Sequence, residues 1–368
     1  MPKEPRFVKN MLECQGLMLC IDFGSLPTLS KKNWPSRGNE RMDITVFVTK
    51  DFARMSEVAA QLAVKKIIAV LKSKKEATLG LATGNSPTGL YKHLARAATD
   101  GRFDPGRIRS FNLDEYIGLP GDNAQQRTLH PESYAYFMVQ ELFGLLHKKF
   151  IDTQVPYGSL VDQKKLIREL ARYKSDWSYA GTGAGRAITI KTKAESDYLA
   201  WIKKDILDGY ARKIKAAGGI DLQIIGVGGR GHVAFHEAGI PFNQSSMMLV
   251  KLDSNTIANA ITDTHFKTKA ESPSYAVTMG AKLVYQARTV LLVANGARKT
   301  GPVTESLLGE ITPEVPISYG RHYARTGGEL IYVLDRVAAE GLLANRRELK
   351  GRGIVLRELD RPSSRQAD

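Results

Sequence analysis

Short apolar runs rich in β-branched residues alternate with longer segments of helical spacing along most of the chain. The first run, ITVFV at 44–48, precedes a segment from 51 to 72 in which apolar residues recur every three or four positions, as in a helix that buries one stripe. Similar patterns predict helices from Pro87, near 131–146 and over 199–210, and strands at 78–82, 107–111, 221–227, 275–279, 289–294 and 329–334. This alternation predicts βαβ units and a mainly parallel sheet.

The domain organisation follows from where this pattern holds. It breaks down near 156–193, where the Gly-rich turn GTGAGR at 181–186 interrupts the periodicity, so we expect a surface insertion there. We expect one domain over 43–336, preceded by an N-terminal extension over 1–42 and followed by a basic C-terminal tail over 337–368. Acidic residues are interspersed among the basic residues of the tail, which is typical of a solvated helical face.

Composition narrows the class of protein. A hydrophobic fraction of 43% is enough to fill a globular core, and no apolar run is long enough to cross a bilayer. Glu4 and Glu13 stand where a signal or transit peptide avoids acids, so we expect a cytoplasmic protein that does not bind membranes. The net charge of +15 favours a generic basic surface, or attraction of anionic metabolites, over specific nucleic-acid binding, because the basic residues are not clustered. Cys14 and Cys20 lie far from every other motif and predict neither a disulfide framework nor a metal site.

The first candidate site is the segment LATGNSPTG at 81–89, where a buried strand must turn sharply into a helix. Gly84 permits the turn, Ser86 suits the N-cap, and Pro87 suits the first helical position. Free backbone N–H groups at the helix start, with the hydroxyls of Thr83 and Ser86, make an anion site. A plain strand-to-helix turn uses the same residues, and the segment matches neither the Walker pattern nor the dinucleotide fingerprint.

Adjacent acidic residues mark the end of the next strand. Asp114 and Glu115 follow the strand at 107–111, in the region where open α/β sheets gather their ligands. Neighbouring carboxylates on an extended segment point to opposite sides, so one can face a pocket while the other makes a structural contact. A loop N-cap is the structural alternative for either residue.

A glycine-rich strand end carries the strongest local signal. In IIGVGGRGHVAFHEAG at 224–239, an apolar strand runs into four glycines within six residues, and His232, His236 and Glu237 follow. Such glycine density lets the backbone approach a ligand closely, and His232 is well placed there for proton transfer, with Glu237 to orient its ring. A structural histidine on a turn is the alternative. No metal is predicted, because the spacing is not H-E-x-x-H and a third ligand is missing from the pattern.

A similar arrangement of strand, glycine turn and basic helix start occurs in VLLVANGARKTGP at 290–302. Lys299 can reach an anion from the start of this helix. A solvent-facing lysine is the common case at such a position, so this segment alone predicts little.

Taken in order, these four segments, together with HPESY at 130–134 and EAGIPF at 237–242, resemble the glucosamine-6-phosphate deaminase family, which is related to the 6-phosphogluconolactonases. The resemblance spans roughly residues 43 to 335 and makes 43–336 a deaminase/isomerase-like catalytic domain. It implies a three-layer α/β/α, modified Rossmann-like fold. It also implies conversion of glucosamine 6-phosphate and water to fructose 6-phosphate and ammonia, within N-acetylglucosamine catabolism, without a metal or organic cofactor. The family includes monomers and hexamers, so a homo-oligomer stays open.

The resemblance also implies roles for individual residues. Asp114 would be the base that moves a proton from C2 to C1 of the opened sugar. His232 would open the pyranose ring, with Glu237 as its partner. The phosphate of the sugar would be bound by Lys299 and by the loop residues Thr83, Gly84, Asn85 and Ser86.

The chain departs from the family pattern at three places. Arg230 stands where family members have Asp or Asn, and an arginine cannot accept the imidazole's proton and would depress the pKa of that ring if close. Phe-Asn-Glu-Pro in the family becomes Phe-His-Glu-Ala at 235–238. Thr256 replaces a phosphate-binding arginine, a loss of about 1.5–3 kcal/mol unless Arg230 or Arg298 substitutes.

Two other functions stay open at this point. A 6-phosphogluconolactonase-like hydrolase is disfavoured, because the chain reads Asp-Glu-Tyr at 114–116 where the lactonases typically read Asp-Glu-Arg. A non-catalytic sugar-phosphate sensor is the second alternative, since effector domains of some bacterial repressors share this fold. A sensor should carry a DNA-reading helix pair, and the extension over 1–42 is too short and irregular for one.

Overall fold

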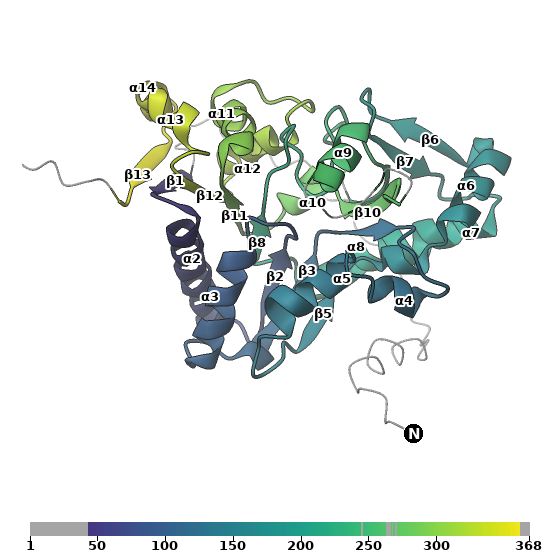
Figure 1. Ribbon diagram of the computed structural model, residues 1–368, viewed down its shortest axis with the longest axis horizontal. Coiled ribbons are helices and arrows are strands. Elements are labelled where there is room, and N and C mark those ends of the chain that lie inside the picture. Colours follow the sequence, from purple (N-terminus) through teal and green to yellow (C-terminus); the bar gives the residue numbers. More distant parts are fainter. Residues whose placement is uncertain (1–42, 244–245, 263–265, 267, 269–270, 361–368) are drawn as a thin grey trace, which may run out of the picture. The chain divides into compact units, whose positions relative to one another are not determined.

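The computed structural model describes residues 43–243, 246–262, 266, 268 and 271–360 (Figure 1). The predicted extension over 1–42 lies outside the described residues, as does the end of the chain beyond residue 360. The described part forms two β-sheets, one with eight strands and one with five. No helix in these ranges is long and apolar enough to cross a membrane.

The larger sheet is parallel throughout, with strand order β13-β1-β12-β11-β8-β2-β3-β5. Its strands are β1 (Ile44–Thr49), β2 (Ala77–Leu81), β3 (Ile108–Asn112), β5 (Asp152–Gln154), β8 (Leu222–Ile225), β11 (Thr289–Ala294), β12 (Glu329–Asp335) and β13 (Val355–Glu358). Six of these correspond to strands that the apolar runs predict, and the expected mainly parallel sheet is confirmed.

Helices lie on both faces of this sheet. The helices of the described residues, on this sheet and elsewhere, are α2 (Phe52–Ser73), α3 (Thr88–Thr99), α4 (Ala124–Thr128), α5 (Tyr134–Met138), α6 (Gln163–Arg172), α7 (Asp197–Trp201), α8 (Asp208–Ala216), α9 (Ser254–Thr262), α10 (Ala281–Val284), α11 (Thr300–Leu308), α12 (Tyr319–Arg325), α13 (Glu340–Ala344) and α14 (Arg346–Gly351). The predicted helices near 131–146 and 199–210 each contain a π-helical turn, at Val139–Phe143 and Ile202–Leu207.

Alternate residues of the central strands belong to two separate cores. Leu291 and Val293 of β11 pack with residues of α2 and α3, which lie side by side in Figure 1. Val290 and Leu292 of the same strand pack instead with residues of α8, α11 and α12. Because successive side chains of a strand point to opposite faces, this division places a helical layer on each face. The three-layer α/β/α fold is therefore confirmed.

The chain reverses its direction of travel across the sheet between β2 and β8. These strands are neighbours, with Leu79 paired to Leu222. From β2 the chain passes through α3 to β3 on one side, whereas from β8 it goes on to β11 on the other. Open α/β sheets bind ligands beyond the carboxyl ends of their strands at such a switch point. The loops after these four strands are thus the expected walls of a site.

The second sheet is antiparallel and has the order β4-β10-β9-β7-β6. Its strands are β4 (Asp114–Ile117), β6 (Trp177–Ala180), β7 (Arg186–Ile190), β9 (Met247–Lys251) and β10 (Tyr275–Met279). The apolar run at 275–279 is a strand, as predicted, but it pairs antiparallel here because an apolar run does not specify its partner. The predicted insertion near 156–193 supplies β6 and β7, so hydrogen bonds join it to this sheet.

The chain beyond 336 also contributes to the larger sheet. Residues expected as a basic tail form α13, α14 and β13, and β13 pairs parallel with β1 through Val46 and Leu356. Leu342 and Leu349 are fully buried, which anchors the two helices. The predicted boundary at 336 therefore falls before the last strand of the sheet. The sequence predicted a solvated tail because most residues of these helices are polar or charged. Its few leucines, which are the buried residues, do not form an apolar pattern that stands out from the charges.

Candidate active site

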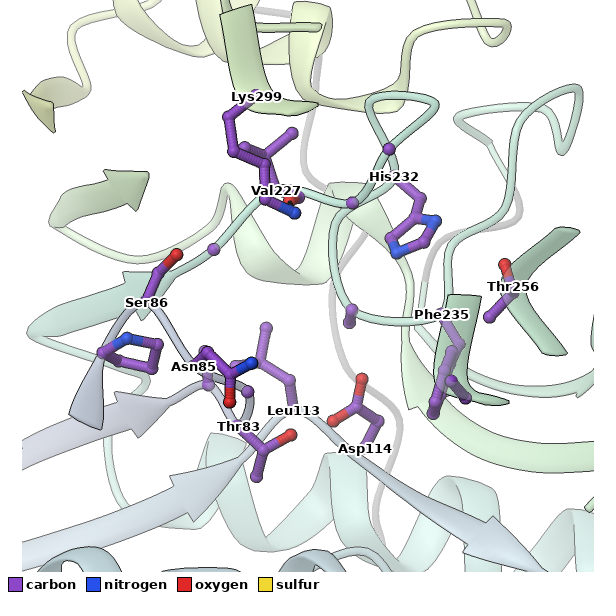
Figure 2. A pocket seen from close by; sticks show the side chains of 18 of the residues that line it. Thr83, Asn85, Ser86, Leu113, Asp114, Val227, His232, Phe235, Thr256 and Lys299 are labelled. Carbon is purple, nitrogen blue, oxygen red and sulfur yellow. Dashed lines mark hydrogen bonds between the residues drawn. The ribbon is translucent and has the colours of Figure 1, made fainter. Parts of the chain in front are cut away.

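A pocket of about 490 Å³ lies at the carboxyl ends of β2, β3, β8 and β11 (Figure 2). This volume is within the range of small-molecule sites. The structure brings eight of the predicted site residues to its wall: Thr83, Gly84, Asn85, Ser86, Asp114, His232, Thr256 and Lys299. Two others, Glu237 and Arg230, are not part of the lining. The four motifs are therefore far apart in the sequence but share one cavity.

The loop after β2 turns at Gly84, whose φ of 100° is in the left-handed region that favours glycine. The prediction that Ser86 is the N-cap of α3 is wrong. Pro87 occupies that position, and no side chain within the described residues caps the helix. Ser86 instead donates a hydrogen bond to Oδ1 of Asn295 at 2.7 Å, which ties this loop to the one after β11. The N–H of Thr88 donates to the backbone oxygen of Asn85 at 3.4 Å, but no side chain within the described residues caps the first turn of α3.

Lys299 connects the loop after β11 to the end of β8. Its Nζ donates to the backbone oxygen of Val227 at 2.6 Å. The loop itself is held by Gly296, which has a φ of 84° and whose N–H donates to the carboxylate of Asp335 at 3.0–3.1 Å. The ammonium group of Lys299 therefore lies at the pocket wall, and hydrogen bonds hold the backbone of its loop in place.

Asp114 lies where the chain passes from the larger sheet to the smaller one. The preceding residue, Leu113, donates to the backbone oxygen of Leu81 and accepts from the N–H of Met279, which fixes the crossing point. The carboxyl group lines the pocket although the residue is only 5% exposed. Burial, and then the charge of the neighbouring Glu115, raises the pKa of Asp114 well above its usual range. A carboxylate in this setting is a strong base for its type.

Glu115 points to the opposite side and caps α5. Its carboxylate accepts hydrogen bonds from the Ser133 hydroxyl at 2.8 Å and from the N–H groups of Tyr134 and Ala135 at 3.0 Å. Burial raises its pKa to about 7, although these hydrogen bonds act in the opposite direction. The prediction that one of the two adjacent carboxylates faces a pocket while the other makes a structural contact is confirmed.

His232 depends on the glycines that precede it. The N–H of Gly228 donates to the backbone oxygen of His232, and a Cβ added at Gly228 would lie 1.8 Å from Nε2 of the ring. Two residues on, Ala234 has a φ of 51°, the one positive φ among non-glycine residues of the described ranges. Strained backbone of this kind concentrates at functional sites, where surrounding structure holds a side chain in place.

Glu237 lies behind His232, away from the cavity. Its Oε2 is 3.5 Å from Nδ1 of His232, and the hydroxyl of Thr256 donates to the same oxygen at 3.0 Å. Burial would raise the pKa of Glu237, but the interactions with His232 and Thr256 outweigh it and hold the pKa below its ordinary value. The carboxylate therefore stays ionised beside the imidazole.

His236 is a structural residue. It is fully buried, the N–H of Ala281 donates to its Nδ1 at 3.0 Å, and Nε2 lies 2.9 Å from the backbone oxygen of Ile240. Burial lowers its pKa to about 4, so the ring is neutral with its proton on Nε2. Within the described ranges, no cluster of three or more His, Cys, Asp or Glu residues could hold a metal ion.

The two divergent positions have partners that the sequence did not reveal. Nη1 of Arg230 lies 3.2 Å from Oδ2 of Asp253, so the guanidinium is paired with an acid. Thr256, in place of an arginine, contacts Glu237 as described above. Asp253 directly precedes α9 and its Oδ1 accepts from the N–H of Asn255 at 2.7 Å. An aspartate before Ser-Asn at a helix start signals an N-cap, and nothing in that pattern predicts the pairing with Arg230.

An aromatic cluster beside Asp114 was also missed. Tyr116, Tyr134 and Phe235 line the pocket, with ring centroids 4.9 to 5.9 Å apart. The rings add apolar surface beside the carboxyl group, whose burial is the main cause of its raised pKa. Tyr134 belongs to HPESY, so the resemblance was the one available signal for it.

Comparison with known proteins gives a consistent result, although no family model matches the chain. A glucosamine-6-phosphate deaminase of Clostridium botulinum (strain Loch Maree) is 30% identical over 297 residues, 81% of this chain and 98% of the relative. One from Thermoanaerobacter sp. (strain X514) is 31% identical over 271 residues, 74% and 86% of the two chains. A solved monomeric glucosamine-6-phosphate deaminase superposes with a TM-score of 0.59 at 26% identity, covering 80% of this chain and 99% of that one. The 6-phosphogluconolactonase of Trypanosoma brucei, at 16% identity and a TM-score of 0.52 over 82% and 99%, shares the fold alone.

Proposed function

The chain belongs to the glucosamine-6-phosphate deaminase family, and from this membership we propose that its pocket converts glucosamine 6-phosphate and water to fructose 6-phosphate and ammonia. The observation that carries the proposal is the convergence of three groups on one cavity. These are the buried carboxyl of Asp114, the His232–Glu237 pair and the cationic wall with Lys299. The alignments cover 98% and 86% of the own length of the two relatives.

We assign the sugar phosphate to the end of the pocket formed by the loops after β2 and β11. The uncapped N-terminus of α3 presents backbone N–H groups to an anion, and Lys299 adds a positive charge. The hydrogen bond between Ser86 and Asn295 holds the two loops at a set distance. Binding at this end supplies energy that orients the reacting carbons toward Asp114 and His232.

Ring opening is the step we assign to His232. The imidazole takes the proton of the anomeric hydroxyl and delivers a proton to the ring oxygen, so that the C1–O5 bond breaks and C1 becomes an aldehyde. Glu237 stabilises the imidazolium that forms in between, because its carboxylate lies against Nδ1. His232 and Asp114 both line the pocket, and Figure 2 shows the imidazole above the carboxyl group of Asp114 in this view.

Proton transfer between the carbons is the step we assign to Asp114. Its carboxylate removes the proton of C2 while O1 gains one, which gives an enolamine, and the proton then returns to C1. The result is an iminium at C2 and a CH₂OH group at C1. Water adds to C2, the C–N bond breaks, and ammonia and the ketose leave. Desolvation of Asp114 strengthens it as a base for this transfer.

The test is incubation of the purified protein with glucosamine 6-phosphate while ammonium and fructose 6-phosphate are measured. We expect Asp114→Asn to lose at least about 100-fold in kcat, since a positioned acid or base contributes that much. Asp122→Asn is the matched control, because Asp122 is exposed and outside the pocket. Absence of turnover with this sugar and with its galactosamine and N-acetyl relatives would overturn the proposal.

We further propose, from the family membership, that the reaction serves N-acetylglucosamine catabolism in the cytoplasm. Release of a ketose phosphate and ammonia would provide carbon and nitrogen from an amino sugar. Disruption of the gene should abolish growth on N-acetylglucosamine as sole carbon source, and unchanged growth would contradict this assignment.

A further inference from the structure

Two buried acids and two basic side chains lie together behind the pocket wall. The side chains of Glu237 and Asp253 are only 3% and 2% exposed. His232 stands against the first acid and Arg230 against the second, at 3.5 Å and 3.2 Å. Each acid thus has one basic partner, and the partner of Glu237 is the histidine to which we assign ring opening.

The two acids are held side by side by the backbone. The N–H of Asp253 donates to Oε1 of Glu237 at 3.3 Å, and Oδ1 of Asp253 caps α9 through Asn255. The Gly-rich turn before β7 packs closely against both acids. A Cβ added at Gly185 would lie 2.6 Å from Cγ of Glu237 and 3.2 Å from Cβ of Asp253. Because these contacts hold both carboxylates in place, the positions of Arg230 and His232 determine which basic side chain pairs with which acid.

Arg230 is the most exposed member of the four. Its side chain is 50% exposed, whereas that of His232 is 18% exposed. A guanidinium is always charged and forms strong paired hydrogen bonds with carboxylates, so it competes well with an imidazole for an acid. Glu237 is a second buried carboxylate beside Asp253, since it accepts the backbone N–H of that residue, so it is the alternative partner for Arg230 once Asp253 is removed.

We propose that Asp253 is a positioning residue for the reaction: it holds the guanidinium of Arg230 away from Glu237, so that Glu237 stays paired with His232. The contribution to catalysis rests on the proposed function, but the effect on His232 does not. In this chain, Asp253 offsets the arginine that stands two residues before the histidine.

Other charged groups near His232 do not replace this pairing. His236 interacts with it electrostatically but is neutral near pH 7, because burial lowers the pKa of His236 to about 4. Asp114 and Lys299 face His232 from other walls of the pocket. Among the described residues, Glu237 is the one carboxylate within ion-pair distance of the imidazole.

The test measures the titration midpoint of the His232 ring by NMR in the full chain, with the signal assigned by its loss in His232→Gln. Asp253→Asn keeps an N-cap oxygen for α9 but removes the charge that holds Arg230. We expect the midpoint to fall by about one pH unit or more, because His232 loses its carboxylate partner to a cation. We expect kcat/KM near neutral pH to fall in parallel.

The double variant Asp253→Asn with Arg230→Gln separates positioning from a direct charge effect. Removing the guanidinium should restore most of the midpoint and of kcat/KM. Asp162→Asn is the matched control, since Asp162 caps α6 through Lys165 and lies elsewhere. Should Asp253→Asn fail to fold, Asp253→Ser retains a capping oxygen and provides the same comparison.

The inference is overturned if the midpoint in Asp253→Asn stays within about 0.3 pH units of the wild type, well inside the shift expected from losing an ion pair. It is also overturned if the double variant keeps the full shift. These outcomes do not depend on turnover. A protein inactive toward every amino-sugar phosphate would contradict the proposed function while leaving the NMR result to decide this inference.

Discussion

Replacing Gly228 by alanine tests whether the position of His232 controls the activity. The added Cβ would lie 1.8 Å from Nε2 of the ring, which is 1.6 Å short of the 3.4 Å at which ordinary contacts begin. Gly228 does not have a positive φ, so alanine is compatible with its backbone. The imidazole, rather than the chain, must therefore give way, and it loses its alignment with Glu237.

A displacement of about 1 Å at a catalytic group costs on the order of 100-fold in rate, or about 2.7 kcal/mol. We expect that loss in kcat/KM, measured by ammonium release from glucosamine 6-phosphate, with the far-UV circular dichroism unchanged. Gly301→Ala is the matched control, because its Cβ would meet nothing within 4 Å and Gly301 is outside the pocket. A folded Gly228→Ala protein with wild-type kcat/KM would refute the reasoning that places His232 at the chemistry.

Three further predictions concern other contacts of the site. Lys299→Met should raise KM at least about tenfold with a smaller change in kcat, because it removes a charged contact to the phosphate; an unchanged KM would remove Lys299 from the phosphate site. Thr256→Val should lower kcat about fivefold through loss of the hydrogen bond to Glu237, whereas equal rates would show that this bond is dispensable. His236 binds its proton more weakly in the folded state, with a pKa of about 4 against 6.5, so its stabilising contribution is present above pH 6.5 and is lost as pH falls toward 4. That loss is on the order of 3 kcal/mol, and urea unfolding should show it in the wild type but much less in His236→Asn.

The secondary structure of the larger sheet could be predicted because its signals are local. The apolar composition of TLGLA at 78–82 predicts a strand, and Gly84 and Pro87 after it indicate where the strand ends. Of the antiparallel strands, the sequence predicted β10 but not the other four. β4 follows β3 after a single residue, so the sequence predicts only an extended segment past the end of β3, and β6 and β7 lie in a segment whose alternation is weak.

The candidate site could likewise be predicted where its signals are local. Asp114, His232 and Lys299 each follow the end of a buried parallel strand, and those ends meet at one edge of the sheet whatever the loops do between them. The assignment of Ser86 as an N-cap was wrong because its hydroxyl finds a partner 209 residues away, in Asn295. Local propensity cannot include a group that distant.

The sequence by itself determined the α/β layers, the four strand-end motifs and the family to which they belong, because each depends on side-chain periodicity or on a few adjacent letters. Only the tertiary structure decided which acid meets Arg230. From the sequence, Arg230 is expected to depress the pKa of the His232 ring if it lies close. In the structure Arg230 pairs with Asp253, and Glu237 pairs with the imidazole. Those partners come from the loop after β8 and from the start of α9, two segments that only the folded chain brings together. Electrostatic pairing falls steeply with distance and burial, so the chemistry of the site depends on that packing.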